Sequence, residues 1–293
     1  MDVSVIMVNY NTCEMTMNAI KSILEKTTDI SYEIIVVDNG STDRSKEIFE
    51  NDSRISYIYS EKNLGFGRAN NLGLKIAKGR NILFLNTDTL LLNNAVKILS
   101  DYIDSDDKIG VCGGNLYSKE GKPAVSFERF FPGPLKTLNY LTKGFLYKSI
   151  FRNISFNHSS HPIEVAYVCG ADMMVKRSVL DECGSFSPQY FMYYEETDLC
   201  RRIKKSGKRI RVVPDAKIIH LEGGTVNKNN PGFNYRKFEM QSVSRKIFIK
   251  TAHGPFYRCL DKFLLLALYR ISGLLKPIEK KHYYKLIDIY CKA

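Results

Sequence analysis

The first hundred residues alternate between β-branched runs and segments with helical spacing, and this alternation constrains the fold most strongly. The runs with strand character are Val3–Asn9, Glu33–Val37, Ile55–Tyr59 and Ile82–Leu85. The intervening segments are a helix over Glu14–Lys26, a helix opening near Ser41 with Asp43 in its first turn, and a helix over Ala69–Ala77. Strands joined by helices of this length require parallel crossovers. The pattern therefore predicts an open, mostly parallel α/β sheet flanked by helices.

The second half of the chain is less regular. We expect strands at Ile109–Leu116 and Val165–Cys169, an aromatic and basic insert between them at Phe127–Asn157, a helix from near Glu196 to Lys205, and short strands at Ile210–Val213 and Ile218–His220. From Pro231 onward the chain has helical spacing and is rich in Lys and Arg. We accordingly expect an α/β domain at residues 1–228 and a basic amphipathic helical region at 229–293.

Charge and cysteine usage narrow the class of protein. A formal net charge of +12 indicates that some face meets an anion, which could be nucleic acid, anionic lipid or a phosphorylated substrate. The seven cysteines are scattered and never spaced as C-x-x-C, which favours a reducing compartment over a disulfide framework. Asp2 stands where a secretory signal would carry positive charge, and the apolar run at Phe263–Leu268 is too short to span a bilayer. We expect a cytoplasmic, peripheral protein.

Three polar clusters follow predicted strands. They are Asn9-Tyr10-Asn11, Asp38-Asn39-Gly40-Ser41 and Asn86-Thr87-Asp88. Ligands of open parallel sheets bind beyond the carboxyl ends of the strands. Each aspartate alone is more often a turn residue or a helix cap, but three clusters at consecutive strand ends favour a shared polar crevice.

The residue types in this crevice suit a nucleoside diphosphate sugar. Asp38 could accept a hydrogen bond from the imide N–H of uracil or thymine. Asp88 could hold Mg²⁺ or Mn²⁺, which would neutralise charge on the departing diphosphate. The chain has neither a G-x-G-x-x-G after its first strand nor a Walker loop, so a dehydrogenase and a P-loop NTPase fit poorly.

Six ordered motifs carry a resemblance to a known family. They are VSVIMVNYN, VVDNGSTD, NLGFGRANNLG, LFLNTDT, FMYYEETDLCRR and HLEGGT. Together, over roughly residues 3–225, they resemble family 2 glycosyltransferases of the GT-A fold, and most closely the rhamnosyltransferase-like branch, in which Asn-x-Asp replaces Asp-x-Asp. The resemblance implies inverting transfer from a dTDP- or UDP-sugar with a divalent metal. By position it implies donor contacts from Val8, Tyr10, Asp38, Arg68, Asn71 and Asp88.

The acidic cluster Glu195, Glu196 and Asp198 is the candidate catalytic group. In the family the motif reads Glu-Asp-x-Asp with the first Asp as base, so the role falls on Glu196, although Glu replaces Asp here and Glu195 stays the alternative. Acids are also favoured at a helix N-terminus for purely structural reasons, and Asp198 could simply cap or pair there.

Four further residues complete the expected site. His220 precedes a Gly-Gly turn and, by resemblance, joins Asp88 as a metal ligand. Tyr193 and Tyr194 are expected on the acceptor side, since aromatic faces bind sugar rings, although core packing would also explain them. Asp172 could touch either sugar or be only a turn residue.

The basic tail and the insert suggest a membrane surface as partner. Phe256–Ile289 interleaves apolar residues with Arg and Lys, as does the insert around Phe130, Phe131 and residues 138–152. Such a segment could lie on an anionic membrane that carries a lipid-linked glycan acceptor, or pack on the sheet with a solvated charged face. We expect no nucleic-acid partner.

Two other functions stay open. A catalytically inactive basic protein that binds membrane or nucleic acid would be expected to have lost the acidic residues, yet they are present. A sugar-nucleotidyltransferase would carry a Gly-rich basic loop after its first strand, where this chain has Asn9-Tyr10-Asn11-Thr12.

Overall fold

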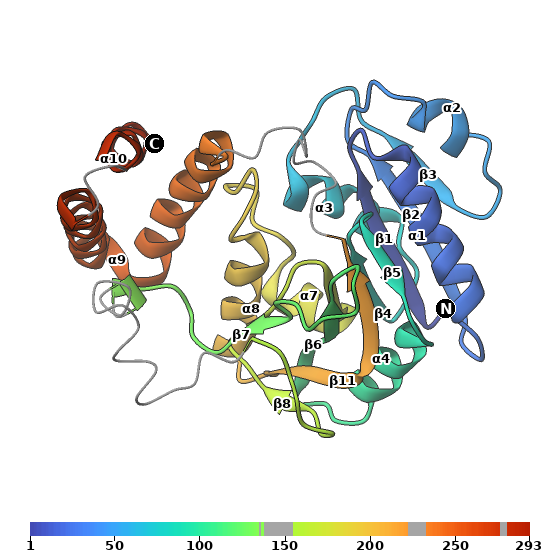
Figure 1. Cartoon of the computed structure of the whole chain (residues 1–293). Helices are drawn as coiled ribbons and strands as arrows, with labels where there is room; N and C mark the ends of the chain where they lie inside the picture. The colour runs from blue at the N-terminus through green and yellow to red at the C-terminus, as the bar shows by residue number, and fades with distance from the viewer. Residues whose placement is uncertain (135, 138–154, 222–232, 276–279) are drawn as a thin grey trace. The chain divides into compact units, whose positions relative to one another are not determined.

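The computed structural model describes residues 1–134, 136–137, 155–221, 233–275 and 280–293 (Figure 1). The chain forms two compact units. Unit 1 comprises Met1–Arg129, Ile154–Pro188 and Glu195–Asn230, and unit 2 comprises Phe130–Asn153, Gln189–Tyr194 and Pro231–Ala293. The second unit thus contains two upstream segments in addition to the expected helical region at 229–293.

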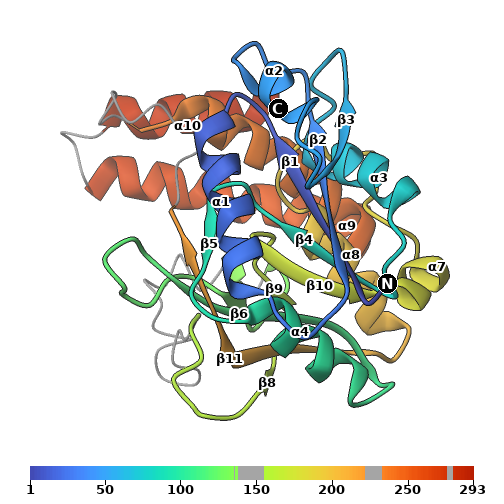
Figure 2. The same ribbon diagram turned by 90° about the vertical axis from the view of Figure 1, so that its right-hand side faces the viewer.

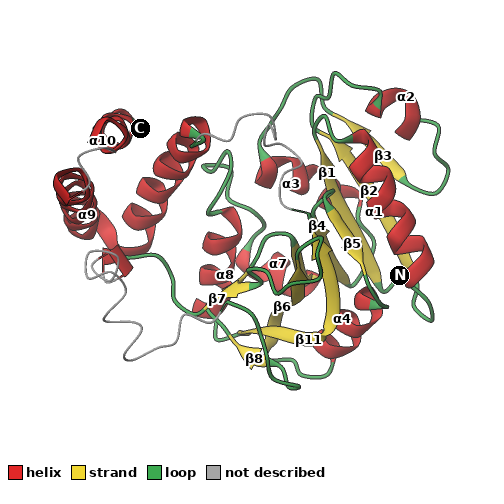
Figure 3. Cartoon of the chain, in the orientation of Figure 1, coloured by secondary structure: helices red, strands yellow, loops and turns green. Residues whose placement is uncertain are grey.

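Unit 1 is built on a mixed sheet with helices on both faces (Figure 3). The strand order is β3-β2-β1-β4-β10-β6-β11-β5, with β8 beside β11. The strands are β1 (Val3–Asn9), β2 (Tyr32–Asp38), β3 (Ser56–Tyr59), β4 (Asn81–Leu85), β5 (Thr89–Leu91), β6 (Ile109–Tyr117), β8 (Ile163–Glu164), β10 (Asp172–Lys176) and β11 (Arg209–His220). The four N-terminal strands β1 to β4 pair in parallel, as the alternation predicts.

The helices of unit 1 divide between the two faces because side chains of a strand alternate. They are α1 (Cys13–Lys26), α2 (Ser45–Phe49), α3 (Phe66–Ile76), α4 (Ala95–Asp104), α7 (Arg177–Cys183) and α8 (Glu195–Lys205). Val5 and Met7 of β1 pack in one core with α1 and α4, and α1 runs beside β1 and β5 in both views (Figures 1 and 2). Ile6 faces the opposite side, where Gly73 lets α3 approach closely.

Several local expectations differ from the structure. The two predicted strands at Ile210–Val213 and Ile218–His220 form one strand, β11, with a register shift between Val213 and Lys217. Pro214 lies in this shift, and a proline cannot donate to the ladder. Helix α2 starts at Ser45, because the Asp43 carboxylate accepts the Ser45 N–H just before the helix. In the segment Val165–Cys169 only β9 (Tyr167–Val168) pairs, with β7 (Phe127–Glu128).

The C-terminal part of unit 2 is largely helical over its described residues, whereas the segment Gln189–Tyr194 is not helical. Unit 2 contains α9 (Tyr235–Leu275) and α10 (Lys280–Lys292). Gly254 adopts a left-handed φ of 86° and Pro255 follows, so α9 is two helices joined at a kink. Tyr190, Phe248 and Ile249 form its buried cluster. Among the described residues, no helix combines the length and the apolar character needed to cross a bilayer. The predicted residues 138–152 of the insert and the turn Glu222–Thr225 lie outside the described residues.

Candidate active site

The three polar clusters meet at the carboxyl edge of the sheet and are joined by hydrogen bonds. Asp38 Oδ1 accepts the Ser41 N–H at 2.9 Å, and the Ser41 hydroxyl oxygen accepts from Asn9 Nδ2 at 3.0 Å. Asn9 Oδ1 accepts the Thr12 hydroxyl at 2.9 Å, and Thr12 Oγ1 lies 3.2 Å from Thr87 Oγ1. The clusters after β1, β2 and β4 therefore form one continuous network, which confirms the predicted convergence.

Asp38 is held rigidly at the end of β2. Its side chain is fully buried, and Oδ2 accepts the Tyr57 hydroxyl at 2.9 Å. Burial, and then the Asp38 charge, raises the pKa of Tyr57, which stays a donor to the carboxylate. Val8 is half-buried and Tyr10 is exposed on either side of Asn9, which pairs with Asp38 across the two strands. Val8, Tyr10 and Asp38, which are expected to contact the nucleotide base, therefore lie at the ends of the neighbouring strands β1 and β2.

Arg68 and Asn71 of α3 hold the loop at residues 186–188. Arg68 Nε donates to the Pro188 carbonyl at 2.8 Å. Asn71 Nδ2 donates to the Phe186 carbonyl at 2.8 Å, and its Oδ1 accepts the Phe186 N–H at 3.2 Å. These contacts give both side chains a structural role. Their expected contacts with the nucleotide-sugar stay predictions.

Asp88 and His220 lie side by side because β5 pairs antiparallel with β11. His220 faces Thr89 in the register, and the Leu221 N–H donates to the Asp88 carbonyl at 2.9 Å. This pairing brings His220 Nε2 to 3.4 Å from Asp88 Oδ1, with both side chains about seven-eighths covered. The fold therefore brings an imidazole nitrogen and a carboxylate oxygen close together from residues 132 positions apart in the sequence.

The acidic cluster occupies the first turn of α8. A Cβ on Gly67 of α3 would lie 3.5 Å from the Cβ of Glu195, whereas a Cβ on Gly170 would lie 3.5 Å from the Cγ of Glu196. The two neighbouring carboxylates therefore point to different surroundings. Glu195 is buried, and no described residue donates to its Oε2, whereas Glu196 is half-buried.

Burial perturbs both glutamates. It raises the pKa of the Glu195 carboxyl well above its ordinary value, and the nearby charge of Glu196 adds to the rise. It also raises the pKa of the Glu196 carboxyl. A carboxylate with a raised pKa is a better proton acceptor near neutral pH, so the physical environment suits a general base.

Asp198 is engaged in a different way. Its Oδ2 accepts from Arg202 Nε at 2.9 Å, one helical turn along α8. The same guanidinium donates to the carbonyls of Gly184 at 3.1 Å and Ser185 at 2.7 Å. Asp198 thereby orients an arginine that fastens the loop after α7. The i, i+4 spacing was a signal for this pair that the sequence interpretation did not use.

Asp172 lies beside the network at the start of β10. It pairs with Leu85 of β4, and the Asn86 N–H donates to the neighbouring Ala171 carbonyl at 2.9 Å. Asp172 is fully buried, its Oδ2 accepts the Gly114 N–H, and burial raises the pKa of its carboxyl well above the ordinary range. These contacts indicate a structural role in the sheet.

Tyr193 and Tyr194 belong to unit 2. Both adopt left-handed φ values, 69° and 70°, which are rare for residues with a side chain. The Tyr194 ring packs on Phe248 with centroids 5.6 Å apart, and its hydroxyl lies 3.3 Å from Arg245 NH1. Lys237 lies over the Tyr193 ring at 5.9 Å. Their expected contact with an acceptor stays a prediction.

Comparison with known families decides the classification. The model of the family described as Glycosyl transferase family 2 matches residues 4–184, which is more than half of the chain. The chain belongs to glycosyl transferase family 2. The motifs at the strand ends predicted this family, and the match confirms it.

Proteins similar to this family 2 chain come from several organisms. The chain is 27% identical over 220 residues to the low-salt glycan biosynthesis hexosyltransferase Agl10 of Haloferax volcanii, covering 71% of this chain and 64% of the relative. It is 23% identical over 280 residues to the dTDP-rhamnosyl transferase RfbF of Shigella flexneri, covering 94% and 83%. It is 28% identical over 218 residues to the rhamnosyltransferase WbbL of Escherichia coli, covering 69% and 78%.

A solved structure confirms the fold of this family 2 chain. The crystal structure of GalNAc-T7 with UDP, GalNAc and Mn²⁺ superposes with a TM-score of 0.65 at 16% identity. The match covers 96% of this chain and 55% of that chain, so this chain spans little more than half of the neighbour's length. The predicted GT-A architecture with a helical C-terminal extension is confirmed.

The donor set of this family 2 chain is compatible with a divalent cation. The described residues contain no group of three or more His, Cys, Asp and Glu that could hold a metal. Asp88 and His220 supply two donors, and atoms about 3 Å apart can occupy neighbouring corners of an octahedron with ligands at about 2.1 Å. Mg²⁺ and Mn²⁺ sites at phosphates often take only one or two protein ligands, the remainder being phosphate oxygens and water. The pair therefore fits a cation that a diphosphate helps to bind.

Proposed function

We propose that this chain is an inverting, metal-dependent glycosyltransferase. It transfers a sugar, rhamnose or a hexose, from a dTDP- or UDP-sugar to a hydroxyl of a lipid-linked glycan in cell-surface polysaccharide synthesis. The observation that carries the proposal is the Asp88–His220 pair, which adjoins the hydrogen-bonded network of Thr87, Thr12 and Asn9. The common position of this pair and of the strand ends at one edge of the sheet supports a cation site beside the base-binding residues.

Asp88 and His220 are the residues that would hold the cation in this proposal. When bound, it would supply Lewis-acid stabilisation of the charge that grows on the leaving diphosphate. The chain's own part is to hold the carboxylate and the imidazole in place, and the β5–β11 pairing does so through the Leu221 N–H and the Asp88 carbonyl. The donor base would lie against Val8, Tyr10 and the rigid Asp38.

Glu196 is the proposed base, with Glu195 as the alternative. The acceptor oxygen forms a bond to the anomeric carbon while the bond from that carbon to the diphosphate oxygen breaks. The acceptor proton passes to the Glu196 carboxylate, and the nucleoside diphosphate leaves with the electron pair. Attack from the face opposite the diphosphate inverts the anomeric carbon. The half-buried position of Glu196 and its raised pKa support this role.

The nature of the donor is supported by the names of the relatives. RfbF is a dTDP-rhamnosyl transferase and WbbL a rhamnosyltransferase, whereas Agl10 is a hexosyltransferase. The Asn86-Thr87-Asp88 motif leads us to place dTDP-rhamnose first and UDP-hexoses second. A lipid-linked acceptor would place the enzyme on the cytoplasmic face of a membrane.

A panel of nucleotide-sugars tests the proposal. The full chain is incubated with dTDP-rhamnose, UDP-glucose, UDP-galactose or UDP-N-acetylglucosamine, with Mn²⁺ or with EDTA, and released dTDP or UDP is measured. A matching donor at 100 times its dissociation constant should stabilise the fold by about 2.7 kcal/mol. We expect one donor to be bound and hydrolysed or transferred only with the divalent cation. If no donor stabilises the protein or is consumed, the proposal fails.

A further inference from the structure

The second half of α9, after the kink at Gly254, carries an exposed apolar stripe. Its members recur at intervals of four, three, four, four and three residues, which is the repeat of one helix face. They are the exposed Phe256, Leu260, Phe263, Ile271 and Leu274 and the half-buried Ala267. Phe256 is 73% exposed, Phe263 69% and Leu274 73%. On the opposite face Asp261 and Leu265 are buried, so the stripe points away from the packed interior of unit 2.

The size of these side chains distinguishes the stripe from the single exposed apolar residues that are common on protein surfaces. Single exposed apolar residues are normal, but a contiguous apolar row with two phenylalanines marks an interaction surface. The row runs for five turns of helix from Phe256 to Leu274. Burying even part of this area would be favourable, since apolar surface contributes about 25 cal/mol per Å² removed from water.

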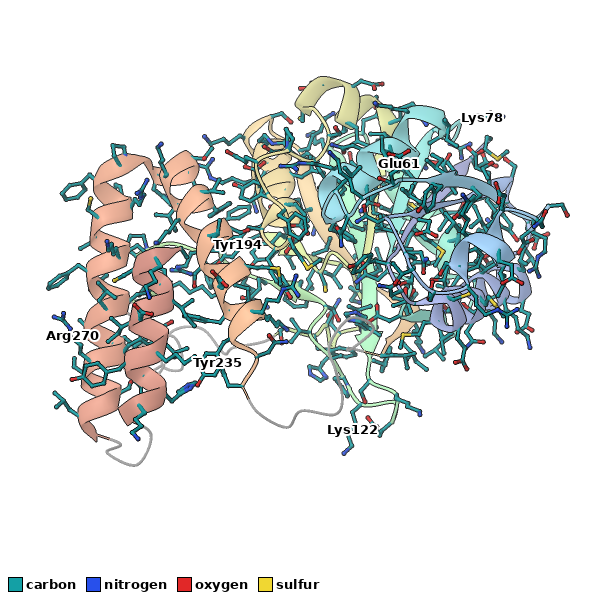
Figure 4. The ribbon with its side chains drawn as sticks, turned by 90° about the horizontal axis from the view of Figure 1, so that it is seen from above. Glu61, Lys78, Lys122, Tyr194, Tyr235 and Arg270 are labelled. Carbon is teal, nitrogen blue, oxygen red and sulfur yellow. The ribbon has the colours of Figure 1, made fainter. Side chains whose placement is uncertain are left out.

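The charge around the stripe identifies the kind of partner. The 63 residues from Pro231 to the end contain 13 Lys and Arg and four Asp and Glu, an excess of nine, which is most of the chain's net +12. Between Pro255 and Leu274 the one acidic residue is Asp261, which is buried and paired with Arg245. The charges that this helix presents to solvent are Arg258, Lys262 and Arg270. At 3.6 residues per turn, Arg270 lies beside the stripe, whereas Arg258 and Lys262 lie nearer the face of Asp261 and Leu265. Figure 4 shows Arg270 on the side of the helix turned away from α10.

Cations of unit 2 lie close enough to repel one another. Burial, and after it the positive charge of Lys262, lowers the pKa of the Lys246 ammonium, and Arg258 contributes in the same direction. A second copy of the chain docked stripe to stripe would bring together two units that each carry an excess of positive charge, which is unfavourable. An anionic surface would neutralise this charge, so charge favours a membrane over self-association.

We propose that the stripe on the second half of α9 lies in the interface of an anionic membrane, with Phe256, Phe263 and Leu274 inserted among the lipids and Arg270, beside the stripe, at the headgroups. An amphipathic helix with an apolar face and basic polar face binds membranes in this way. Each Lys or Arg near an anionic surface contributes about 1 kcal/mol, which is about fivefold in the partition coefficient. The inference rests on the proposed function in one respect: membrane binding would hold the enzyme beside a lipid-linked acceptor.

Vesicle co-sedimentation of the full chain tests the inference. Vesicles of phosphatidylcholine with about one-third phosphatidylglycerol are compared with pure phosphatidylcholine, at low and high salt. We expect strong binding to the anionic vesicles, weakened by salt. The F256S/F263S variant should bind roughly tenfold or more weakly, because two large apolar groups are lost. The R258Q/K262Q/R270Q variant should bind at least about fivefold more weakly, because Arg270 lies beside the stripe.

Matched controls come from unit 1. M17S/L92S removes two exposed apolar residues, and K21Q/R44Q/R54Q removes three exposed charges, without touching the stripe. Both should bind as the unaltered chain does. Equal loss in the control and stripe variants would overturn the inference, as would an absence of binding to anionic vesicles. A dimer in solution that F256S/F263S dissociates, without vesicle binding, would assign the stripe to a second copy and also overturn it.

Release of dTDP or UDP in water separates this inference from the proposed function. If the chain consumes a nucleotide-sugar but ignores vesicles, the membrane surface is wrong and the enzyme assignment stands. If it binds vesicles through the stripe but consumes no donor, the proposed function fails and the membrane surface stands.

Discussion

His220 Nε2 lies 3.4 Å from Asp88 Oδ1 because β5 and β11 pair across the end of the sheet. The distance is longer than that of a good hydrogen bond, and it is compatible with two atoms that bind the same cation. Variants of these two residues are therefore the most direct test of cation binding.

Replacing Asp88 should remove metal-dependent turnover. Asp88→Asn keeps the shape of the side chain but removes its charge, so we expect the rate to fall by about 10²–10³, equivalent to several kcal/mol of lost Lewis-acid stabilisation. His220→Gln should raise the Mn²⁺ concentration needed for half-maximal activity. Mn²⁺ titrations of nucleotide release, with EPR of free Mn²⁺ in the presence of UDP, measure both effects. Asp101→Asn, on the exposed surface of α4, is the control. Unchanged Mn²⁺ dependence in both site variants would remove these residues from the cation site.

Replacing Glu196 should separate binding from chemistry. Glu196→Gln cannot accept the proton, so transfer should fall by about 10²–10⁴ while the donor still stabilises the fold. Because burial raises the pKa of Glu196, the acid limb of the kcat/KM profile should lie above the ordinary glutamate value of about 4.3. Glu195→Gln is the comparison. A larger loss in Glu195→Gln than in Glu196→Gln would move the base to Glu195.

Because Glu195 is buried, its contribution to the free energy of unfolding should fall as the pH rises. Its pKa is higher in the folded chain, so the folded state binds the proton more tightly. The stabilisation that the protonated Glu195 gives the folded chain is complete below about pH 4.3, the pKa of a glutamate in the unfolded chain. It is lost as the pH rises through the pKa of Glu195 in the folded chain, by up to about 1.4 kcal/mol per pH unit. Urea unfolding of the unaltered chain and of Glu195→Gln over this range should show the difference narrowing at low pH. Glu14→Gln, at an exposed position, controls for the loss of one charge. A pH-independent difference would contradict the prediction.

The Asp198–Arg202 pair predicts a loss of stability rather than of chemistry alone. Asp198→Ala leaves a partly buried guanidinium without its carboxylate and loosens the carbonyls of Gly184 and Ser185. We expect a cost of about 3 kcal/mol, at the lower end for breaking a buried pair. Differential scanning calorimetry measures it. Lys21→Ala, which breaks the exposed pair with Glu25, should cost less than about 1 kcal/mol. If Asp198→Ala abolishes transfer with the stability intact, Asp198 acts in catalysis instead.

The strand ends were predictable because local patterns determine them. Val3–Asn9 is β-branched and ends in polar residues, so both the strand and its edge position follow from period and composition. The link between Thr12 and Thr87 was not predictable, since it joins residues 75 positions apart through the sheet order. Glu195 and Glu196 are neighbours in sequence, yet one faces α3 and the other faces Gly170, and only the packing of α8 distinguishes them. The membership of Gln189–Tyr194 in unit 2 likewise depends on tertiary contacts, because six residues carry no domain signal.

Arg245 and Asp261 provide the last test, within unit 2. The guanidinium donates to both carboxylate oxygens at 2.9 and 2.7 Å and also to the Thr137 hydroxyl at 2.7 Å, and Asp261 is almost fully buried. Removing one partner, as in Asp261→Ala, should cost about 3–5 kcal/mol, because it leaves a buried charge unpaired. Asp101→Ala breaks the exposed Lys97–Asp101 pair and should cost less than about 1 kcal/mol.

The double variant Arg245→Met/Asp261→Leu completes this test. It replaces both charges by apolar groups of similar volume, so it should recover most of the stability lost in Asp261→Ala. Urea unfolding followed by circular dichroism, which reports the helices of both units, measures all three variants. If the double variant is as unstable as Asp261→Ala, packing around Asp261 rather than the unpaired charge causes the loss.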